Sequence, residues 1–106
     1  MIIVTSGQIA GKRIAKTLGL VKGNTIRARH LGKDIVAGLK NLVGGEIEEY
    51  TKLMAEAREQ AMDRMIAAAK ELGANAIIDV RFSTSYVMGM ASEILVYGTA
   101  VLVEDA

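Results

Sequence analysis

Residues 46–72, EIEEYTKLMAEAREQAMDRMIAAAKEL, decide how the rest of this chain is arranged. The stretch holds no proline and no glycine, and glycines stand outside it at 44, 45 and 73. Its apolar residues recur at steps of three and four, the spacing of one face of an α-helix. Acidic residues near its start and Gly73 after its end suit the two ends of a helix. The sequence therefore predicts one long amphipathic helix over 46–72. Its apolar positions are Ile47, Tyr50, Met54, Ala57, Ala61, Met65, Ala68 and Leu72.

Two β-strands are predicted after this helix. In the first, residues 76–82 alternate, so that Asp79 and Arg81 share one face and an apolar set shares the other. Residues 83–90 are polar and contain glycine, which favours a connection between strands. Ser92–Val103 is the longest predicted strand, and both of its faces are largely apolar, which normally means that both are covered. The apolar set of the first strand is Ala76, Ile78, Val80 and Phe82.

The first 45 residues predict shorter elements. Residues 2–5 form a short strand, and the Gly23-Asn24 pair between residues 12–21 and 25–29 is typical of a two-residue hairpin turn. Apolar residues at steps of four and three over 31–42 predict a short helix that contains Gly38. A glycine there allows another helix or subunit to approach closely. Together these elements predict one α+β domain over 1–106, with a small antiparallel or mixed sheet packed on one long helix.

Composition narrows the classes of function. The chain of 106 residues has no cysteine, which excludes disulfides, thiolate nucleophiles and cysteine-bound metal. No apolar run has membrane-spanning length and the first residues do not resemble a signal peptide, so we expect a cytoplasmic protein without membrane association.

Charge is distributed unevenly. Residues 1–45 carry a net charge of +7 and residues 46–106 a net charge of −6. The two parts are expected to lie against each other, within one protomer or between subunits. The alternative is a basic surface that binds a small anion through Lys12, Arg13, Arg27 and Arg29. The near-neutral total and only four aromatic residues argue against nucleic acid.

The length of the predicted helix suggests assembly. At 1.5 Å per residue it is about 40 Å long, while a compact domain of this size has a radius of gyration near ~13 Å. One such helix covers one face of a small sheet and leaves the second apolar face of the last strand open. We therefore expect neighbouring protomers to close part of this surface, with the two hairpin arms pairing across the boundary.

Residues 28–85, from ARHLGKDIVAGL to VRFSTS, and EILVYGTAV at 93–101 resemble the YbjQ-like family of small bacterial and archaeal proteins. The resemblance implies a dodecin-like α+β protomer that forms a ring-shaped homopentamer in which extra short strands link neighbours. The family is uncharacterised, and its members carry a label as heavy-metal-binding proteins. Its most specific segments are residues 34–38, Gly44-Gly45, Tyr50, Ala57-Arg58-Glu59, residues 72–76 and Tyr97-Gly98-Thr99-Ala100. The residues expected at the interface between subunits are Gly38, Tyr50, Val96, Tyr97 and Val101.

The metal hypothesis depends on a single histidine. His30 and Asp34 are four residues apart and share one helical face if the short helix starts early, with glutamates near residue 46 as further oxygen ligands. One protomer does not supply a closed tetrahedral site, but a ring gathers one His30 per subunit. A solvated histidine near a helix start is the alternative. The methionines are expected to fill packing gaps rather than to bind copper.

Catalytic and phosphate-binding patterns are weak. The Gly7–Lys12 segment is one residue shorter than a phosphate loop, and Arg13 occupies the position of the magnesium-binding hydroxyl. No nucleophile stands in a known pairing with a base, so we expect no enzyme. Arg58 lies beside the apolar stripe of the long helix, and we expect it to be partly buried with an acidic partner.

The sequence thus leaves three hypotheses. The first is a non-enzymatic binding or scaffolding protein, a homopentameric ring with a small ligand at the subunit interfaces or the ring axis. The second is a protein that binds a divalent metal through His30 and nearby carboxylates. The third is an anion or nucleotide binder that uses the basic N-terminal third.

Overall fold

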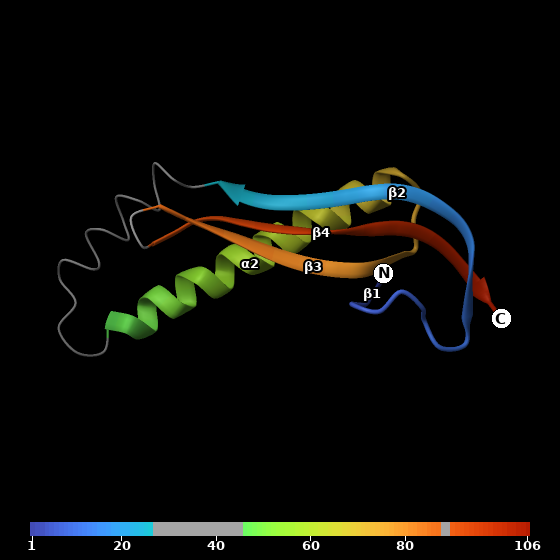
Figure 1. Ribbon diagram of the computed structural model, residues 1–106, viewed down its shortest axis with the longest axis horizontal. Helices are drawn as coiled ribbons and strands as arrows, with labels where there is room; N and C mark the ends of the chain where they lie inside the picture. Colours follow the sequence, from blue (N-terminus) through green and yellow to red (C-terminus); the bar gives the residue numbers. More distant parts are fainter. Residues whose placement is uncertain (27–45, 88–89) are drawn as a thin grey trace.

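The computed structural model describes residues 1–26, 46–87 and 90–106, with side chains described at 1–25, 51–86 and 93–106. In chain order the elements are β1 (Ile2–Ile3), β2 (Lys12–Ile26), α2 (Glu46–Glu71), β3 (Ala76–Val87) and β4 (Met90–Asp105). The strands form one sheet in the order β1-β3-β4-β2, in which β1 is parallel to β3 and the other pairs are antiparallel. Helix α2 crosses one face of this sheet (Figure 1). The predicted α+β class is confirmed, while the predicted helix over 31–42 lies outside the described residues.

Helix α2 matches its prediction to within one residue at its end. Gly73, at a φ of 83°, closes it: its amide donates to the Lys70 carbonyl at 3.0 Å, and the Ala74 amide donates to the Ala69 carbonyl at 3.1 Å. These two bonds form a Schellman cap, which requires the left-handed backbone that glycine adopts freely. The buried stripe advances in steps of four to Ala69, so the predicted final positions, Ala68 and Leu72, are partly buried and exposed respectively. The fully or nearly buried positions are Ala57, Ala61, Met65 and Ala69.

The hairpin predicted at Gly23-Asn24 is wrong, because β2 runs through this pair without a turn. Gly23 lies opposite Val96 of β4, beneath α2. A Cβ atom at Gly23 would overlap the carbonyl oxygen of Ala61 and lie 2.5 Å from the amide nitrogen of Met65. This glycine therefore serves close contact between strand and helix backbone rather than a turn.

Both faces of β4 are covered along part of its length, as its apolar pattern predicts. On the face toward α2, Ile94, Val96 and Ala100 pack with the helix stripe in one core cluster. On the opposite face, Val101 and Val103 form a second cluster with residues of β3, and this cluster is covered by Val4 and Ile9. The chain thus uses its own first residues to cover the end of β4 that we expected a neighbouring protomer to cover.

Strand β3 departs from simple alternation at Asp79, which has a φ of 54° and marks a register shift between Ile78 and Arg81. Before this bulge Ala76 and Ile78 belong to the second cluster, whereas after it Val80 belongs to the cluster under α2. The predicted common face of Ala76, Ile78, Val80 and Phe82 is therefore wrong, because a bulge shifts the face of every later side chain. The connection predicted over 83–90 is also wrong for residues 83–87, which continue β3.

The chain is elongated rather than compact. Its principal extents are 54 × 23 × 18 Å and its radius of gyration is 16.9 Å, against about 13 Å for a compact domain of this length. The 16 residues of β4 account for the long dimension, since a strand rises about 3.3 Å per residue. The compact protomer assumed from the sequence is thus wrong, and a larger share of the sheet lies near the surface.

Candidate functional site

Of the residues predicted to bind an anion, two are described. Lys12 and Arg13 begin β2 directly opposite Asp105 and Glu104 of β4. The Lys12 ammonium donates to an Asp105 carboxylate oxygen at 2.6 Å, and Arg13 forms an ion pair with Glu104. The hydrogen bond and the charge of Lys12 lower the pKa of the Asp105 carboxyl. Both cations are therefore already paired, and an incoming anion would compete with two carboxylates. Arg27 and Arg29 lie outside the described residues.

A hollow of about 430 Å³ lies between the residues before β2 and the ends of β2 and β4. Its polar wall is formed by Gln8 and the two paired cations, and its apolar wall by Ile9, Ile14 and Val103. The Ala106 amide donates to the Gly11 carbonyl at 3.1 Å beside it, which ties the end of the chain to this loop. The mixture of apolar surface and neutralised charge gives this hollow no strong preference for an anion.

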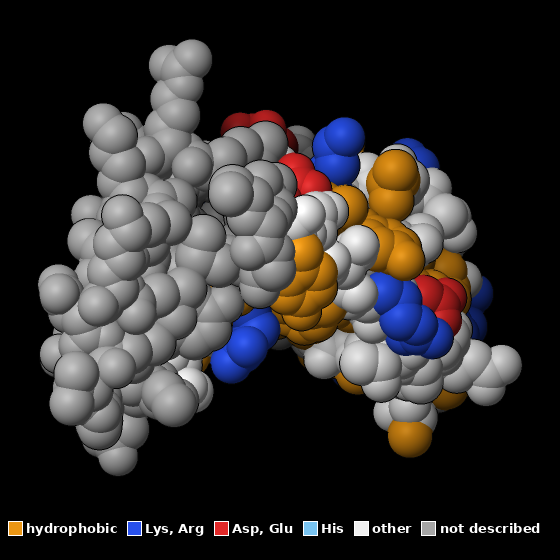
Figure 2. Space-filling view, turned by 60° about the vertical axis from the view of Figure 1, so that its left-hand side comes forward, with side chains coloured by type: hydrophobic (Ala, Val, Ile, Leu, Met, Phe, Trp, Pro, Cys, Tyr) orange, Lys and Arg blue, Asp and Glu red, His pale blue; other side chains and the backbone are white. Residues whose placement is uncertain are grey.

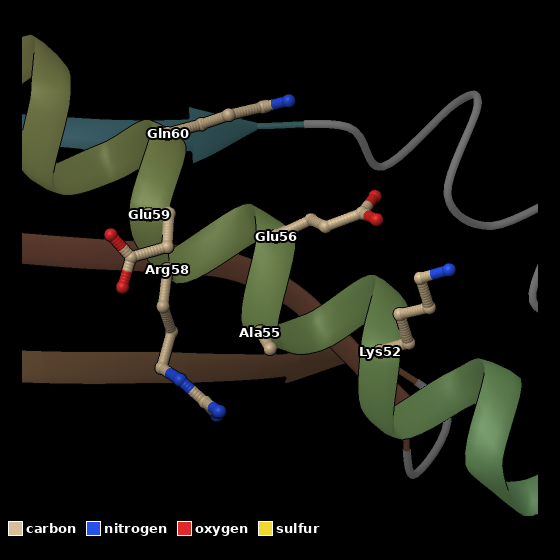
Figure 3. Close-up of a pocket in the computed structure, with 6 residues that line it drawn as sticks. All are labelled: Lys52, Ala55, Glu56, Arg58, Glu59 and Gln60. Carbon is tan, nitrogen blue, oxygen red and sulfur yellow. The ribbon is translucent and has the colours of Figure 1, made fainter.

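A second hollow, of about 490 Å³, lies on the outer surface of α2 (Figure 3). The side chains of Arg58 and Glu56 extend away from each other there, and both are exposed. The prediction of a partly buried Arg58 is therefore wrong, because Arg58 faces solvent on the flank of the stripe. Catalytic sites bring titratable groups together in a pocket, and the side chains of this hollow diverge. Its lining residues are Lys52, Ala55, Glu56, Arg58, Glu59 and Gln60.

Several large hydrophobic side chains on the strands of the sheet are exposed. On the face away from α2, Leu20 of β2 is 70% exposed and Tyr97 of β4 is 37% exposed. On the α2 side of β3, Phe82 and Tyr86 are 49% and 66% exposed, because the helix packs on β2 and β4 and leaves this part of β3 uncovered. Hydrophobic side chains reach the surface beside charged ones in Figure 2. Exposed apolar side chains that lie side by side are typical of interaction sites in soluble proteins.

The sequence identified only one member of this exposed set. Tyr97 was predicted at an interface, and it lies in a cross-strand row with Lys22 and Arg81. Val96 and Val101, predicted with it, are fully buried within one chain. Leu20, Phe82 and Tyr86 were missed: Leu20 was placed in a hairpin arm, and Phe82 on a face presumed to be internal. An aromatic residue inside a stretch of serine and threonine was the available signal for Tyr86.

The predicted metal ligands, His30 and Asp34, lie outside the described residues, as does Gly38. Tyr50 belongs to α2, but its side chain is not among those described. Within the described part of the chain, no three His, Asp or Glu side chains are grouped as metal ligands. None of its helices is long and apolar enough to cross a membrane.

Comparison with known proteins agrees with this architecture. A family model described as "Putative heavy-metal-binding" and named YbjQ matches residues 1–104. A UPF0145 protein of Dehalococcoides mccartyi is 65% identical over 104 residues, covering 98% of this chain and 100% of that protein. A UPF0145 protein of Methanosarcina acetivorans is 58% identical, covering 95% of each chain. The crystal structure of a protein of unknown function from Pediococcus pentosaceus, of the DUF74 family, shares the fold with a TM-score of 0.54 at 21% identity, covering 98% of each chain. A full-length family match and close relatives in bacteria and archaea together show that this chain belongs to the YbjQ-like family of UPF0145 proteins.

Proposed function

We propose that this protein is a non-enzymatic binding or scaffolding protein that assembles into a homopentameric ring and holds a small ligand where subunits meet. The observation that carries this proposal is the exposed hydrophobic set Leu20, Tyr97, Phe82 and Tyr86 on an elongated sheet. Burying such surface against a second copy is favourable by about 25 cal/mol per Å² of apolar area. The number five follows from the family resemblance, which implies a ring of five.

Binding is favoured over catalysis by the state of the titratable side chains around the two hollows. In the hollow beside the start of β2, Lys12 and Arg13 are paired with carboxylates. In the hollow on α2, the charged side chains diverge. General acid–base catalysis needs a donor and an acceptor positioned around one reacting group. Neither hollow provides this arrangement among its described residues. A cysteine-free chain also needs no oxidising compartment, in keeping with the cytoplasm as its location.

Native mass spectrometry of the purified protein, without added ligand, tests the assembly. We expect a species of five chains, and any additional mass per ring reports the class of the bound ligand. Dilution should shift the distribution toward smaller species, because association depends on concentration. A monomer at micromolar concentration would contradict the proposal.

A metal-binding role is the second candidate, and the family description favours it. His30 and Asp34 would supply imidazole and carboxylate ligands, which suit divalent zinc or copper better than a softer monovalent ion. Zinc titration of the intact protein should release protons, and His30→Ala should weaken binding at least as much as Asp34→Asn. A His30→Ala variant that binds zinc as the wild type does would rule this site out.

The anion-binding alternative through Lys12, Arg13, Arg27 and Arg29 has less support. Its two described cations are engaged with Asp105 and Glu104. If it is correct, binding of a phosphate-containing ligand should weaken as salt is added and should survive His30→Ala. This pair of results separates it from the metal hypothesis.

A further inference from the structure

On the face of the sheet away from α2, one cross-strand row places an aromatic ring between two cations. Strand β4 lies between β2 and β3 (Figure 1). Tyr97 of β4 pairs with Lys22 of β2 on one side and with Arg81 of β3 on the other. Side chains at directly opposite positions of neighbouring strands project from the same face of a sheet. All three side chains are exposed, so the row presents a ring flanked by two positive charges to solvent.

The two cations of this row are not neutralised by carboxylates. Within the described part of the chain, neither Lys22 nor Arg81 forms an ion pair, in contrast to the two basic residues at the start of β2. Arg81 donates through Nη1 to the carbonyl oxygens of Thr5, at 2.7 Å, and of Val80, at 2.9 Å. These acceptors hold the guanidinium in place but carry no net charge. The positive charge of Arg81 is therefore still available to an anion.

Two carboxylates on neighbouring parts of β3 and β4 are engaged elsewhere. Glu93, four residues before Tyr97 along β4, accepts a hydrogen bond from the side-chain amide of Asn24 at 3.3 Å. The carboxylate of Asp79 lies beside Gly7, 3.4 Å from the position that a Cβ atom would take there. An anion above Tyr97 thus meets two cations without displacing a carboxylate. In the hollow beside the start of β2, an anion would compete with two carboxylates.

The neighbouring rows limit the size of a ligand. The backbones of Lys22 and Arg81 are two strand spacings apart, roughly 10 Å, so one small molecule above Tyr97 reaches both cations. Neither adjacent row adds another aromatic ring or another cation, so the site has room for one aromatic group. The residues of these rows are Asn24, Leu95 and Ser83 on one side and Leu20, Thr99 and Ile78 on the other.

We propose that this row binds a nucleoside monophosphate, whose base stacks on the ring of Tyr97 and whose phosphate is bound by Lys22 and Arg81. Bases stack on exposed aromatic side chains, and phosphate oxygens are favoured partners of arginine and lysine. This inference deepens the proposed function, because it names the class of the small ligand. It uses residues of one chain only, so it can be tested with or without the ring.

The surface of the sheet favours a nucleotide over a peptide. Peptides are commonly bound by main-chain hydrogen bonds to a strand edge or by apolar grooves. The backbone of β4 is already paired with β2 on one side and with β3 on the other, so recognition above Tyr97 depends on side chains. A ring between two cations matches a ligand that combines a flat aromatic surface with negative charge.

Isothermal titration calorimetry of the intact protein with adenosine 5′-monophosphate tests the site. Adenosine supplies the base without the phosphate, and inorganic phosphate supplies the charge without the base. We expect the nucleotide to bind at least about tenfold more tightly than either, since it contacts both the ring and the cations. Added salt should weaken its binding, because the cations are exposed. Absence of nucleotide binding, or phosphate binding of equal affinity, would overturn the proposal.

Substitutions in the row and matched controls outside it locate the binding. Tyr97→Leu removes the ring but keeps an apolar side chain, and it should weaken nucleotide binding about tenfold. Lys22→Gln should weaken it about threefold and reduce its dependence on salt. Because Lys22 is exposed, this variant keeps the test valid even if Tyr97→Leu fails to fold.

The controls are a tyrosine and a lysine away from the row. Tyr86→Leu lies on the α2 side of the sheet, and Lys16→Gln lies earlier on the same strand as Lys22. Both should bind the nucleotide as the wild type does. Equal losses of affinity in the row variants and in their controls would contradict the assignment of the site.

Native mass spectrometry with the nucleotide separates this inference from the proposed assembly. A ring that carries one nucleotide per chain supports both. A ring that takes up no nucleotide refutes the site and leaves the assembly standing, whereas a monomer that binds one nucleotide supports the site and refutes the ring. A single-stranded oligoadenylate that binds at least about tenfold more tightly than the mononucleotide would overturn the choice of ligand.

Discussion

At the scale of single residues, Gly23 has the largest structural consequence. It lies in the middle of a strand, where glycine is normally unfavourable, and it is retained because the backbone of α2 occupies the space that a side chain would need. The small side chains of Ala57 and Ala61 on the facing helix serve the same close approach. The distance between helix and sheet is thus set by three residues with almost no side chain.

Replacing Gly23 with alanine should push α2 away from β2. We expect Gly23→Ala to lower the free energy of unfolding by about 1–3 kcal/mol or more, the usual cost of overpacking, measured by urea denaturation. Gly7→Ala is the matched control, because the nearest atoms that a Cβ there would meet are those of the Asp79 carboxylate, at an ordinary contact distance of 3.4 Å. A Gly23→Ala variant as stable as Gly7→Ala would show that α2 is not seated on this strand.

The ion pair between Lys12 and Asp105 gives a prediction for pH. The ordinary pKa of the Asp105 carboxyl is 3.8, and Lys12 lowers it in the folded chain. The pairing therefore stabilises the fold above pH 3.8, and this contribution is lost as the pH falls through the folded-state pKa. In an NMR titration Lys12→Ala should raise the pKa of Asp105, while Lys52→Ala on the outer face of α2 should leave it unchanged. Equal values in both variants would disprove the pairing.

At the scale of elements, α2 shows how a buried stripe differs from an apolar one. The sequence offers Leu72 as the last position of the stripe, yet the helix caps at Gly73 and directs Ala69 to the sheet instead. The side chain of Met65, in the middle of this stripe, is fully buried between α2 and the sheet. Burial along α2 therefore follows steps of four from Ala57, and the larger side chain of Leu72 is left near solvent.

Truncations along α2 test this placement. Met65→Ala should cost about 2–5 kcal/mol, as large-to-small changes in packed cores do. Leu72→Ala, at a position 47% exposed, should change the free energy of unfolding by no more than about 0.5 kcal/mol. Chemical denaturation of both variants provides the comparison, and equal losses would mean that the end of the helix is buried in a contact between copies.

Elements also show which features of the fold could be predicted. The long helix and the last strand were found because their periodicity is set by burial over many residues. The β2 hairpin was wrongly predicted because Gly-Asn favours a turn locally, whereas the contact of Gly23 with Ala61 is 38 residues away in sequence and leaves no local signal. The polar extension of β3 was missed for another reason, because an exposed strand needs no apolar alternation. The bulge at Asp79 likewise interrupts a run of apolar residues that gives no local sign of it.

For the candidate site, the sequence predicted a surface for self-association, but two of the residues assigned to it, Val96 and Val101, lie in the core of one chain. A valine that alternates with other apolar residues looks the same whether its face is covered by α2, by the first ten residues or by another copy. Val96 and Tyr97 are adjacent in sequence, yet one is buried under the helix and the other is open. Knowing the layers on each side of β4 was necessary to separate them.

At the scale of the whole molecule, two substitutions separate a residue that one chain buries by itself from a residue expected at the contact between copies. Val101→Asp should unfold the protomer, with a loss on the order of 4–5 kcal/mol, since it buries a charge in the cluster covered by Val4 and Ile9. Tyr97→Asp should leave the circular dichroism spectrum unchanged and reduce the population of the ring in native mass spectra. A Tyr97→Asp protein that keeps the wild-type mass would place this face outside the contact between copies.

The position of β4 in the sheet has a consequence for how the protein is made. It lies between β2 and β3, and it is synthesised after both of them. During translation, β1, β2 and β3 therefore leave the ribosome before β4, the strand with which β2 and β3 pair. Helix α2 can form its local hydrogen bonds without β4. Contacts between residues distant in sequence are made late and slowly. The edge of β2 that pairs with β4 therefore stays uncovered in the nascent chain until the last strand has been made, so the sheet is completed only at the end of synthesis.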